Sequence, residues 1–267
     1  MSSQVRLPVS VVITTFNRPR ALRRTLESLE SANFRCEIII IDDGSKPAVS
    51  SVTNDFPALG IRYYANPNNL GPAQSRNNGF VKASNKLIAF TDDDCAVSED
   101  WLLILYEAIS KADGAVAGVG GRVLALGSDI FSRYYEYHKI LDPWLFRGQC
   151  FYLVTANAIF RRSALIQVGG FDERVRVPGG EDPGLCFKLL NCGYRFKYSP
   201  EAVVYHDFRK GFWEFVKTFY RYGRGCAFQS GRHFRRFDRD DPSQVFGGLE
   251  PDQKLLLLRR NAGDSRC

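Results

Sequence analysis

The chain has 267 residues, of which 45% are hydrophobic and 24% charged, and its formal net charge is +7. This size and composition suit a globular protein with one large α/β domain or two fused halves that share a core. The positive charge suits a polyanionic partner or simple solubility, and net charge alone favours neither. Seven cysteines without a Cys-x-x-Cys pair exclude a disulfide scaffold and a zinc site. Neither a signal peptide nor an apolar run of about 18 residues is found, so we expect a cytoplasmic protein, with peripheral contact at the inner face of the membrane left open.

The first half of the chain alternates β-branched apolar runs with segments of helical spacing. This alternation predicts an α/β fold with a mostly parallel, Rossmann-like sheet and helices on both faces. The strands are expected at 9–15, 36–41, 61–65 and 86–91, and helices begin at Pro19, Pro72 and about Glu99.

The second half is more irregular. Asp182 is a good N-cap, Pro183 suits the first helical position and Gly193 suits the position after the helix, so a helix is predicted between them. Phenylalanines at helical spacing over 212–222 predict an amphipathic helix. Strands are expected at 118–126, 151–160, 194–198 and 203–205, with a short helix at 161–167.

Three polar clusters directly follow predicted strands. They are Thr15-Phe16-Asn17, Asp42-Asp43-Gly44-Ser45 and Asp92-Asp93-Asp94. In a parallel α/β sheet, ligands bind beyond the carboxyl ends of the strands. We therefore expect these clusters to converge although they lie far apart in the sequence.

The triple aspartate is the sharpest of these features. Adjacent carboxylates repel one another unless they share a cation, and Asp92 and Asp94 should project on the same side of the strand end. Such hard oxygen ligands suit Mg²⁺ or Mn²⁺ bridged to phosphate. A solvated acidic turn that caps the next helix is the alternative, and this pattern alone favours neither.

Two further candidates have ordinary structural alternatives. Asp42 and Asp43 could accept hydrogen bonds from a ribose or a base, or they could cap a turn in which Gly44 supplies the unusual backbone angle. Arg76, in the first turns of a predicted helix, could fork onto a phosphate or contact a base, or it could be a surface arginine.

Two more candidates lie in the second half. Glu181 and Asp182 follow a Gly-Gly pair that permits loop motion or close approach, and they could equally serve only the start of their helix. His206 ends a predicted strand and could bind metal or phosphate, although a lone histidine is more often structural.

Taken together, these motifs resemble glycosyltransferase family 2, whose members are inverting enzymes of the GT-A fold. The resemblance covers roughly residues 9–207, and its specificity comes from the order of seven short motifs. They are Val-Val-Ile-Thr-Thr-Phe-Asn-Arg (11–18), Asp-Asp-Gly-Ser (42–45), Asn-Leu-Gly-Pro-Ala-Gln-Ser-Arg-Asn-Asn-Gly (69–79), Phe-Thr-Asp-Asp-Asp (90–94), Gly-Gly-Phe-Asp-Glu (169–173), Gly-Glu-Asp (180–182) and Val-Tyr-His (204–206).

The resemblance implies a role for each matching position. The nucleotide-binding set comprises Thr15, Asn17, Asp43 and Arg76, with Asp42 beside them and with Phe16, Arg18 and Asp93 in the same motifs. Asp92 and Asp94 would form the Asp-x-Asp pair for Mg²⁺ or Mn²⁺, with Asp94 the direct ligand and His206 near the metal. Asp182 would be the catalytic base, with Glu181 next to it.

Two departures from the family pattern bear on the acceptor. Gly184 stands where the family often has a second acid, which leaves the acceptor contacts open. The Gln/Arg-x-x-Arg-Trp motif and the membrane spans of processive synthases are absent, so transfer of one sugar is expected. The partners expected are a nucleotide-diphosphate sugar as donor and a sugar, lipid-linked or other hydroxyl as acceptor, and not nucleic acid.

The C-terminal segment differs from the rest in charge. Between positions 209 and 239 there are nine Lys or Arg and two acids. We expect a catalytic domain over 1–207, comprising a nucleotide-sugar half (1–115) and an acceptor half (116–207), followed by a basic helical extension over 208–267. The aromatic face of this extension would pack on the domain or contact an anionic membrane.

Two other function classes remain as alternatives. A nucleotidyltransferase that makes sugar nucleotides would share the α/β site and the metal, but the loop at 14–19 lacks the glycines such enzymes use for a triphosphate. A non-enzymatic RNA- or membrane-binding module would explain the basic segment, but acidic clusters at three strand ends would repel a polyanion.

Overall fold

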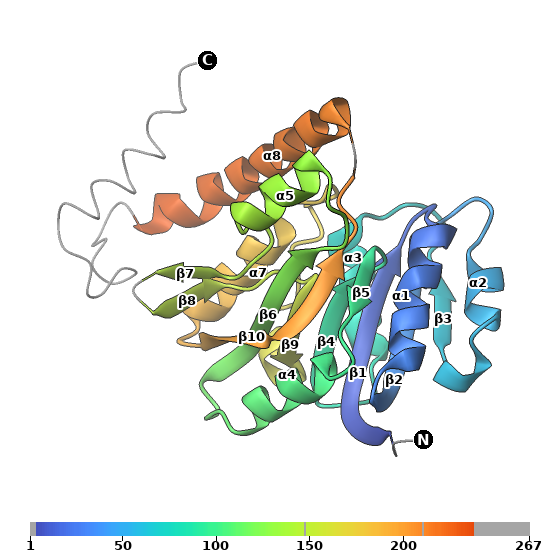
Figure 1. The fold of residues 1–267 in the computed structure, drawn as a ribbon. Helices are drawn as coiled ribbons and strands as arrows, with labels where there is room; N and C mark the ends of the chain where they lie inside the picture. Colours follow the sequence, from blue (N-terminus) through green and yellow to red (C-terminus); the bar gives the residue numbers. More distant parts are fainter. Residues whose placement is uncertain (1–3, 147, 210, 238–267) are drawn as a thin grey trace. The chain divides into compact units, whose positions relative to one another are not determined.

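The computed structural model describes residues 4–146, 148–209 and 211–237 (Figure 1). One compact unit, Met1–Cys226, contains the whole sheet, and a second begins at residue 227, where the last helix continues to residue 237. The first unit runs past residue 207, where we expected the catalytic domain to end. Residues 238–267, the remainder of the predicted extension, lie outside the described residues.

The N-terminal half forms the expected alternation of strands and helices. Strands β3, β2, β1 and β4 lie side by side in this order, and all are parallel. Three short elements were not foreseen, the helices α2 and η1 and the strand β5. The elements are β1 Val5–Thr15, α1 Pro19–Ser31, β2 Phe34–Asp42, α2 Ser50–Asn54, η1 Pro57–Leu59, β3 Arg62–Ala65, α3 Pro72–Lys82, β4 Leu87–Asp92, β5 Cys95–Val97 and α4 Trp101–Ser110.

The second half extends the same sheet. The strand order is β3-β2-β1-β4-β9-β6-β10-β8-β7, with β5 on β10, and β9 runs antiparallel between β4 and β6. The prediction of a mostly parallel central sheet is confirmed, since β3, β2, β1 and β4 are all parallel and β6 is parallel to β10. The elements are β6 Val116–Ala125, α5 Ile130–Tyr137, β7 Trp144–Phe146, β8 Gln149–Tyr152, β9 Asn157–Arg161, α6 Arg162–Gln167, α7 Glu181–Asn191, β10 Arg195–His206 and α8 Phe212–Phe237.

Two strand predictions in this half were wrong in their limits. The strand expected at 151–160 is two strands, because β8 pairs with β10 whereas β9 pairs with β4 and β6. The two strands expected at 194–198 and 203–205 are one strand, β10, whose register on β6 shifts between Ser199 and Val203. Pro200 lies in that shift, where a residue without an N–H is tolerated.

The start of α7 also differs from the prediction. Gly180 is the N-cap and Glu181 the first helical residue, so Asp182 does not cap the helix. Its carboxylate instead accepts hydrogen bonds from Thr155. The prediction for the other end is confirmed, since Gly193 follows the helix with a φ of 82°.

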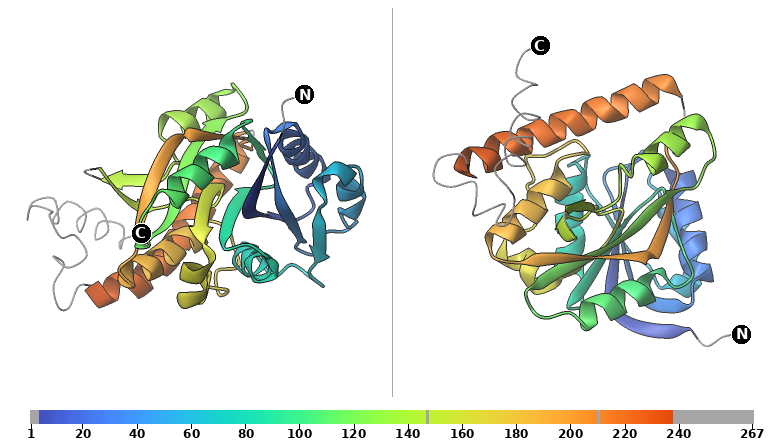
Figure 2. Two further views of the ribbon diagram at one scale, coloured as in Figure 1. Left: turned by 90° about the horizontal axis from the view of Figure 1, so that it is seen from below. Right: turned by 60° about the vertical axis from the view of Figure 1, so that its left-hand side comes forward.

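The strands are buried on both faces and divide their side chains between two cores. In β2, Ile38 and Ile40 point to the core beneath α1 and α4, and Ile39 and Ile41 point to the core beneath α3 and α7. The views in Figure 2 show helices on both sides of the sheet. Among the described residues, no helix combines the length and the apolar character that crossing a membrane requires.

The first turns of α8 pack against α5. Phe215 and Phe219 contact Tyr135, with ring centroids 5.6 Å apart in both pairs, and Phe215 also contacts Tyr134 at 5.1 Å. The aromatic face that the sequence predicts is therefore used for packing at these positions. Trp213, on another face of the helix, is 72% exposed.

Helix α3, which carries Arg76, lies very close to β1. A Cβ atom built on Gly79 would lie 2.3 Å from Val12 Cγ1 and 3.4 Å from Ile41 Cγ1. Valine is stiff at χ1, so Val12 cannot simply turn away. Gly79 thus permits the close packing that places α3 on the sheet.

We predict that Gly79→Ala lowers the free energy of unfolding by about 1–3 kcal/mol through overpacking. In an open helix interior the same change would raise stability by about 1 kcal/mol, so the sign is diagnostic. Urea unfolding measures it, with Gly114→Ala as control, because a Cβ there meets no atom within 4 Å. Equal stability of the two variants would contradict the packing argument, and Val12→Ala in the Gly79→Ala background should restore part of the loss.

Candidate functional site

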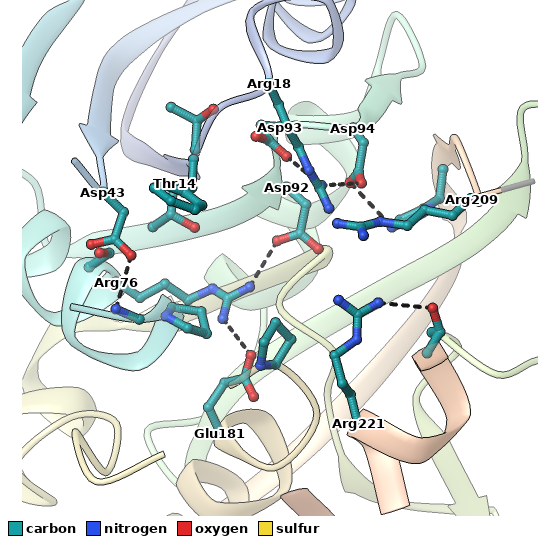
Figure 3. A pocket seen from close by; sticks show the side chains of 18 of the residues that line it. Thr14, Arg18, Asp43, Arg76, Asp92, Asp93, Asp94, Glu181, Arg209 and Arg221 are labelled. Atoms are coloured by element: carbon teal, nitrogen blue, oxygen red, sulfur yellow. Dashed lines mark hydrogen bonds and ion pairs between the residues drawn. The ribbon is translucent and has the colours of Figure 1, made fainter. Parts of the chain in front are cut away.

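A cavity opens at the carboxyl ends of β1 and β4, as the strand-end rule predicts (Figure 3). Its volume is about 360 Å³, and α3, the start of α7, the end of β10 and the first turns of α8 complete its walls. Ten of the residues singled out in the sequence line it: Thr15, Phe16, Arg18, Asp43, Arg76, Asp92, Asp93, Asp94, Glu181 and His206. Asn17, Asp42 and Asp182 do not.

Arg18 holds two of the three adjacent aspartates. Its Nη1 lies 3.0 Å from Asp93 Oδ1 and 2.6 Å from Asp94 Oδ2. Burial and the neighbouring charge of Asp94 raise the pKa of Asp93 to about 7, although Arg18 opposes this. The aspartates therefore differ in role, since Asp93 is buried within the wall whereas Asp94 lies closer to the solvent of the cavity.

Arg76 bridges the two halves of the site. Its Nη2 lies 2.9 Å from Asp92 Oδ1 and its Nη1 lies 2.9 Å from Glu181 Oε1, with the guanidinium 5.9 Å from the ring centre of Phe171. The Arg76 side chain is only 8% exposed. Two carboxylates more than 80 residues apart in the sequence are thus fixed by one buried cation.

A group of possible metal ligands lies beside Arg18. One ligand atom each of Asp92, Asp94, Cys95 and His206 falls within 4.8 Å of the others. His206 reaches this point because β10 pairs antiparallel with β5, which puts His206 opposite Cys95. Its Nε2 lies 3.3 Å from Asp94 Oδ1, and its buried Nδ1 has no hydrogen-bond partner among the described residues.

Cys95 was not foreseen as part of this group. Burial, reinforced by the charges of Asp92 and Asp94, raises the pKa of its thiol, which favours the neutral form. A thiol is also a soft donor, whereas the two carboxylates are hard ones. The donors that suit a hard divalent cation are therefore Asp92 and Asp94, and His206 offers a borderline nitrogen donor beside them.

The two aspartates at the end of β2 have different roles. Asp43 accepts hydrogen bonds from the amides of Leu70 and Gly71, each at 2.9 Å, and so positions the loop before α3 at the cavity. Asp42 is turned inward and accepts from the Ser45 amide and the Tyr63 hydroxyl at 2.8 and 2.6 Å. Burial opposes ionisation of Asp42, but these hydrogen bonds outweigh it and lower its pKa.

Asn17 connects two loops rather than lining the cavity. Its backbone φ is 56°, its amide donates to Ser45 Oγ at 2.8 Å, and its side-chain oxygen accepts from the Lys46 amide at 2.8 Å. Asparagine tolerates this left-handed conformation better than most residues. Asn17 therefore shapes the turn that presents Phe16 and Arg18.

The two acids at the start of α7 are held in different ways. Glu181 is ion-paired with Arg76 and also accepts from the amides of Gly179 and Gly180 at 2.7 and 3.0 Å. Asp182 accepts from the Thr155 amide at 3.0 Å and from its hydroxyl at 2.8 Å. Burial raises the pKa of Asp182 to about 7, with Arg76 opposing and Glu181 reinforcing the shift.

One wall of the cavity was not predicted from the sequence. Arg209, Thr218, Arg221 and Tyr222 all line it, and they come from the basic segment that had been assigned to a separate extension. The local surplus of positive charge was the available signal. It did not show which cations face the site, because neither charge count nor helical spacing fixes the direction of α8.

Comparison with known proteins agrees with this geometry. The family model "Glycosyl transferase family 2" matches residues 10–169. The chain is 33% identical over 250 residues to the "Pre-mycofactocin glycosyltransferase" of Mycobacterium tuberculosis, covering 90% of this chain but only 50% of that protein. It is 29% identical over 210 residues to the "Succinoglycan biosynthesis protein ExoM" of Rhizobium meliloti, covering 74% of this chain and 66% of that protein.

Two solved structures share the fold. A mannosyltransferase from Pyrobaculum calidifontis in complex with GDP-Man and Mn²⁺ is 17% identical, with a TM-score of 0.62 over 100% of this chain and 78% of that one. The structure of GalNAc-T7 with UDP, GalNAc and Mn²⁺ is 21% identical, with a TM-score of 0.61 over 75% of this chain and 44% of that one. These similarities confirm the predicted GT-A-type fold.

We predict that Arg76→Met destabilises the protein by about 3–5 kcal/mol, because it leaves two carboxylates in the wall without their cation. The free energy of unfolding in urea measures this loss. The matched control is Arg195→Met, since Arg195 pairs with Asp113 in solvent and its loss should change stability little. Equal effects of the two substitutions would show that Arg76 is not the cation on which the site depends.

Proposed function

Since the chain belongs to glycosyltransferase family 2, we propose that it transfers one sugar from a nucleoside-diphosphate sugar to an acceptor hydroxyl, with inversion and with a divalent cation. Family membership decides against both the nucleotidyltransferase and the non-enzymatic module. The observation that carries the proposal is the convergence of Asp43, Asp92, Asp94 and Glu181 with Arg18 around one cavity. These residues come from four of the seven motifs on which the resemblance rests.

The nucleoside is proposed to lie at the end of the cavity that Asp43 and the start of α3 form. Phe16 is 42% exposed there and offers an aromatic face. Thr15, whose hydroxyl lies next to the buried Asp93 carboxyl, also lines the cavity. The solved neighbours contain UDP or GDP-Man, which supports a nucleoside-diphosphate donor without fixing its base or sugar.

The residues present fit a divalent cation. Asp92 and Asp94 offer hard oxygens and His206 offers an imidazole whose second nitrogen is still unpaired. The cation would compete with Arg18 for Asp94, since the two are 2.6 Å apart. When bound, it would supply positive charge where the diphosphate leaves.

Asp182 is proposed as the base. The acceptor oxygen forms a bond to the anomeric carbon, the bond from that carbon to the diphosphate oxygen breaks, and the acceptor proton passes to Asp182. A pKa of about 7 suits a base that must be ionised near neutral pH and still bind a proton well. Thr155 can stay bonded to Asp182 after the transfer, because a hydroxyl can accept as well as donate.

Glu181 is less suited to that task. Its oxygens already accept from Arg76 and from the amides of Gly179 and Gly180, so an incoming proton would displace existing bonds. We assign it instead to holding Arg76 and the Gly-Gly loop in place.

The metal prediction concerns Asp94. Mg²⁺ or Mn²⁺ should strengthen nucleoside-diphosphate binding to the wild type, and Asp94→Ala should remove both this cation effect and tight binding. Calorimetry with each cation and with EDTA measures it. Glu107→Ala, which removes an exposed carboxylate that pairs with Lys111, is the control. Equal wild-type affinity in cation and in EDTA would rule out the metal role.

The base prediction concerns Asp182. Asp182→Asn should lower turnover by roughly 10²–10⁴-fold and leave donor affinity unchanged, because an amide cannot take the acceptor proton. Nucleoside-diphosphate release with a competent acceptor measures turnover. Near-normal turnover would move the base to Glu181, and lost donor affinity would place Asp182 in the nucleotide site.

The pH profile provides an independent check. The acid limb of kcat/KM should fall near pH 7, because Asp182 must be ionised to act. The hydrogen bonds from Thr155 favour the ionised form, so Thr155→Val should move this limb to higher pH. Activity at pH 6.5 would then fall more than activity at pH 8.5, and an unmoved limb would argue against Asp182.

A further inference from the structure

Helix α8 forms the wall of the cavity opposite the aspartates. Thr218, Arg221 and Tyr222 line it from the helix, and Arg209 lines it from the segment before the helix. Figure 3 shows the Arg221 guanidinium directed into the cavity, across from Asp92. Arg18 and Arg76, the cations on the other walls, are already committed to carboxylates.

Arg221, by contrast, has no carboxylate partner among the described residues. Its Nη2 donates to Thr218 Oγ1 at 3.0 Å. Its Nε is buried and has no hydrogen-bond partner among the described residues. The nearest acid of the helix, Glu214, is shared by Arg209 and Lys217 at 3.3 and 3.0 Å. Burial and the neighbouring Arg209 lower the pKa of Arg221, as expected for a cation that lacks its counter-ion.

The position of α8 is fixed by contact between backbones. A Cβ on Gly225 would lie 2.5 Å from both Gly179 C and Gly180 N, and a Cβ on Gly180 would lie 2.4 Å from Gly225 O. A Cβ on Gly179 would lie 2.7 Å from Tyr222 Cα. Backbone atoms cannot swing aside as a flexible side chain can, so these glycines are required for the approach.

This contact joins α8 to the acidic wall. The amides of Gly179 and Gly180 donate to Glu181, and Glu181 pairs with Arg76. The loop that touches Gly225 is therefore the loop that holds the central ion pair of the site. A shift of α8 would move Arg221 and disturb this loop together.

We propose that α8 belongs to the donor-binding site and that Arg221 binds the diphosphate of the nucleotide. The contact of Gly225 with Gly179 and Gly180 fixes the position of α8 and so that of Arg221. This inference rests on the proposed function, since it needs a diphosphate in the cavity. A diphosphate brought next to Asp92, Asp94 and Glu181 requires positive charge that those acids do not already neutralise. Arg221 supplies it as a planar fork of N–H donors.

The first experiment compares two arginines of the same helix. Arg224, which contacts the Tyr220 ring, does not line the cavity, so Arg224→Ala removes the same charge without touching the site. Calorimetry uses whichever of ADP, CDP, GDP, UDP and dTDP binds the wild type most tightly, and its parent nucleoside. Arg221→Ala should weaken the diphosphate about 10- to 100-fold, the range for a lost charge-assisted hydrogen bond, and leave the nucleoside unchanged.

Each result of this comparison has one meaning. Arg224→Ala should bind the diphosphate with wild-type affinity. The affinity of Arg221→Lys should lie between those of the wild type and Arg221→Ala. Equal diphosphate affinity in Arg221→Ala and Arg224→Ala would overturn the role of Arg221 while leaving the proposed function intact. If no nucleoside diphosphate bound the wild type, the proposed function itself would fall, and this inference with it.

The second experiment tests the glycine contact. Gly225→Ala should weaken the diphosphate as Arg221→Ala does and also slow sugar transfer, whereas Gly223→Ala should do neither, since a Cβ on Gly223 meets nothing within 4 Å. Thermal unfolding shows whether each variant is folded. Wild-type affinity in a folded Gly225→Ala would refute the positioning role. If Gly225→Ala did not fold, Gly180→Ala, which meets the same contact from the loop, would be measured in its place.

Discussion

The crowding of negative charge at the ends of β1 and β4 is the constraint on which the site depends. Asp92, Asp93 and Asp94 are consecutive, and Glu181 approaches from α7, so four carboxylates crowd together in a cavity that Asp43 also lines. Carboxylates withdrawn from water are costly unless they are paired and hydrogen-bonded. Two arginines, Arg18 from the start of α1 and Arg76 from α3, supply the pairing from opposite sides. The cavity is consequently rigid where it is most acidic, and a ligand finds its partners already oriented.

The order of the strands explains why residues so distant in sequence meet here. Parallel pairing of β1 with β2 and β4 brings the ends of the first, second and fourth strands of the chain to one edge. The antiparallel pairing of β10 with β5 places His206 opposite Cys95, the residue that follows the three aspartates. The antiparallel strand β9 lies between β4 and β6 and carries Asn157, which accepts from the Trp101 indole and so fastens α4 beneath the sheet.

Much of this could be predicted from the sequence, and the limits have physical causes. Buried β-branched runs identified the parallel strands, and the strand-end rule brought Asp43 and Asp92 together. The rule cannot separate Asp42 from Asp43, because neighbouring residues at a strand end point to opposite sides and only the packing decides which faces the cavity. The sequence predicted Asp182 as an N-cap because cap preferences depend on neighbouring residues only. Its actual hydrogen-bond partner, Thr155, lies 27 residues away in the sequence. The direction of α8 depended on a backbone contact that no side-chain pattern records.

The same electrostatic balance links binding to proton transfer. Burial, Glu181 and Asp92 favour the protonated form of Asp182, and Arg76 favours the ionised form, so the pKa of about 7 is a compromise between them. The negative charge of a diphosphate that entered alone would, like Glu181 and Asp92, favour the protonated form of Asp182. It would raise the pKa of Asp182, so that a smaller fraction of the base would be ionised. An arginine on α8 and a cation held by the aspartates would offset the added charge, so donor binding would leave Asp182 able to accept a proton. The positive charge on the facing wall would thus serve the base as well as the leaving group.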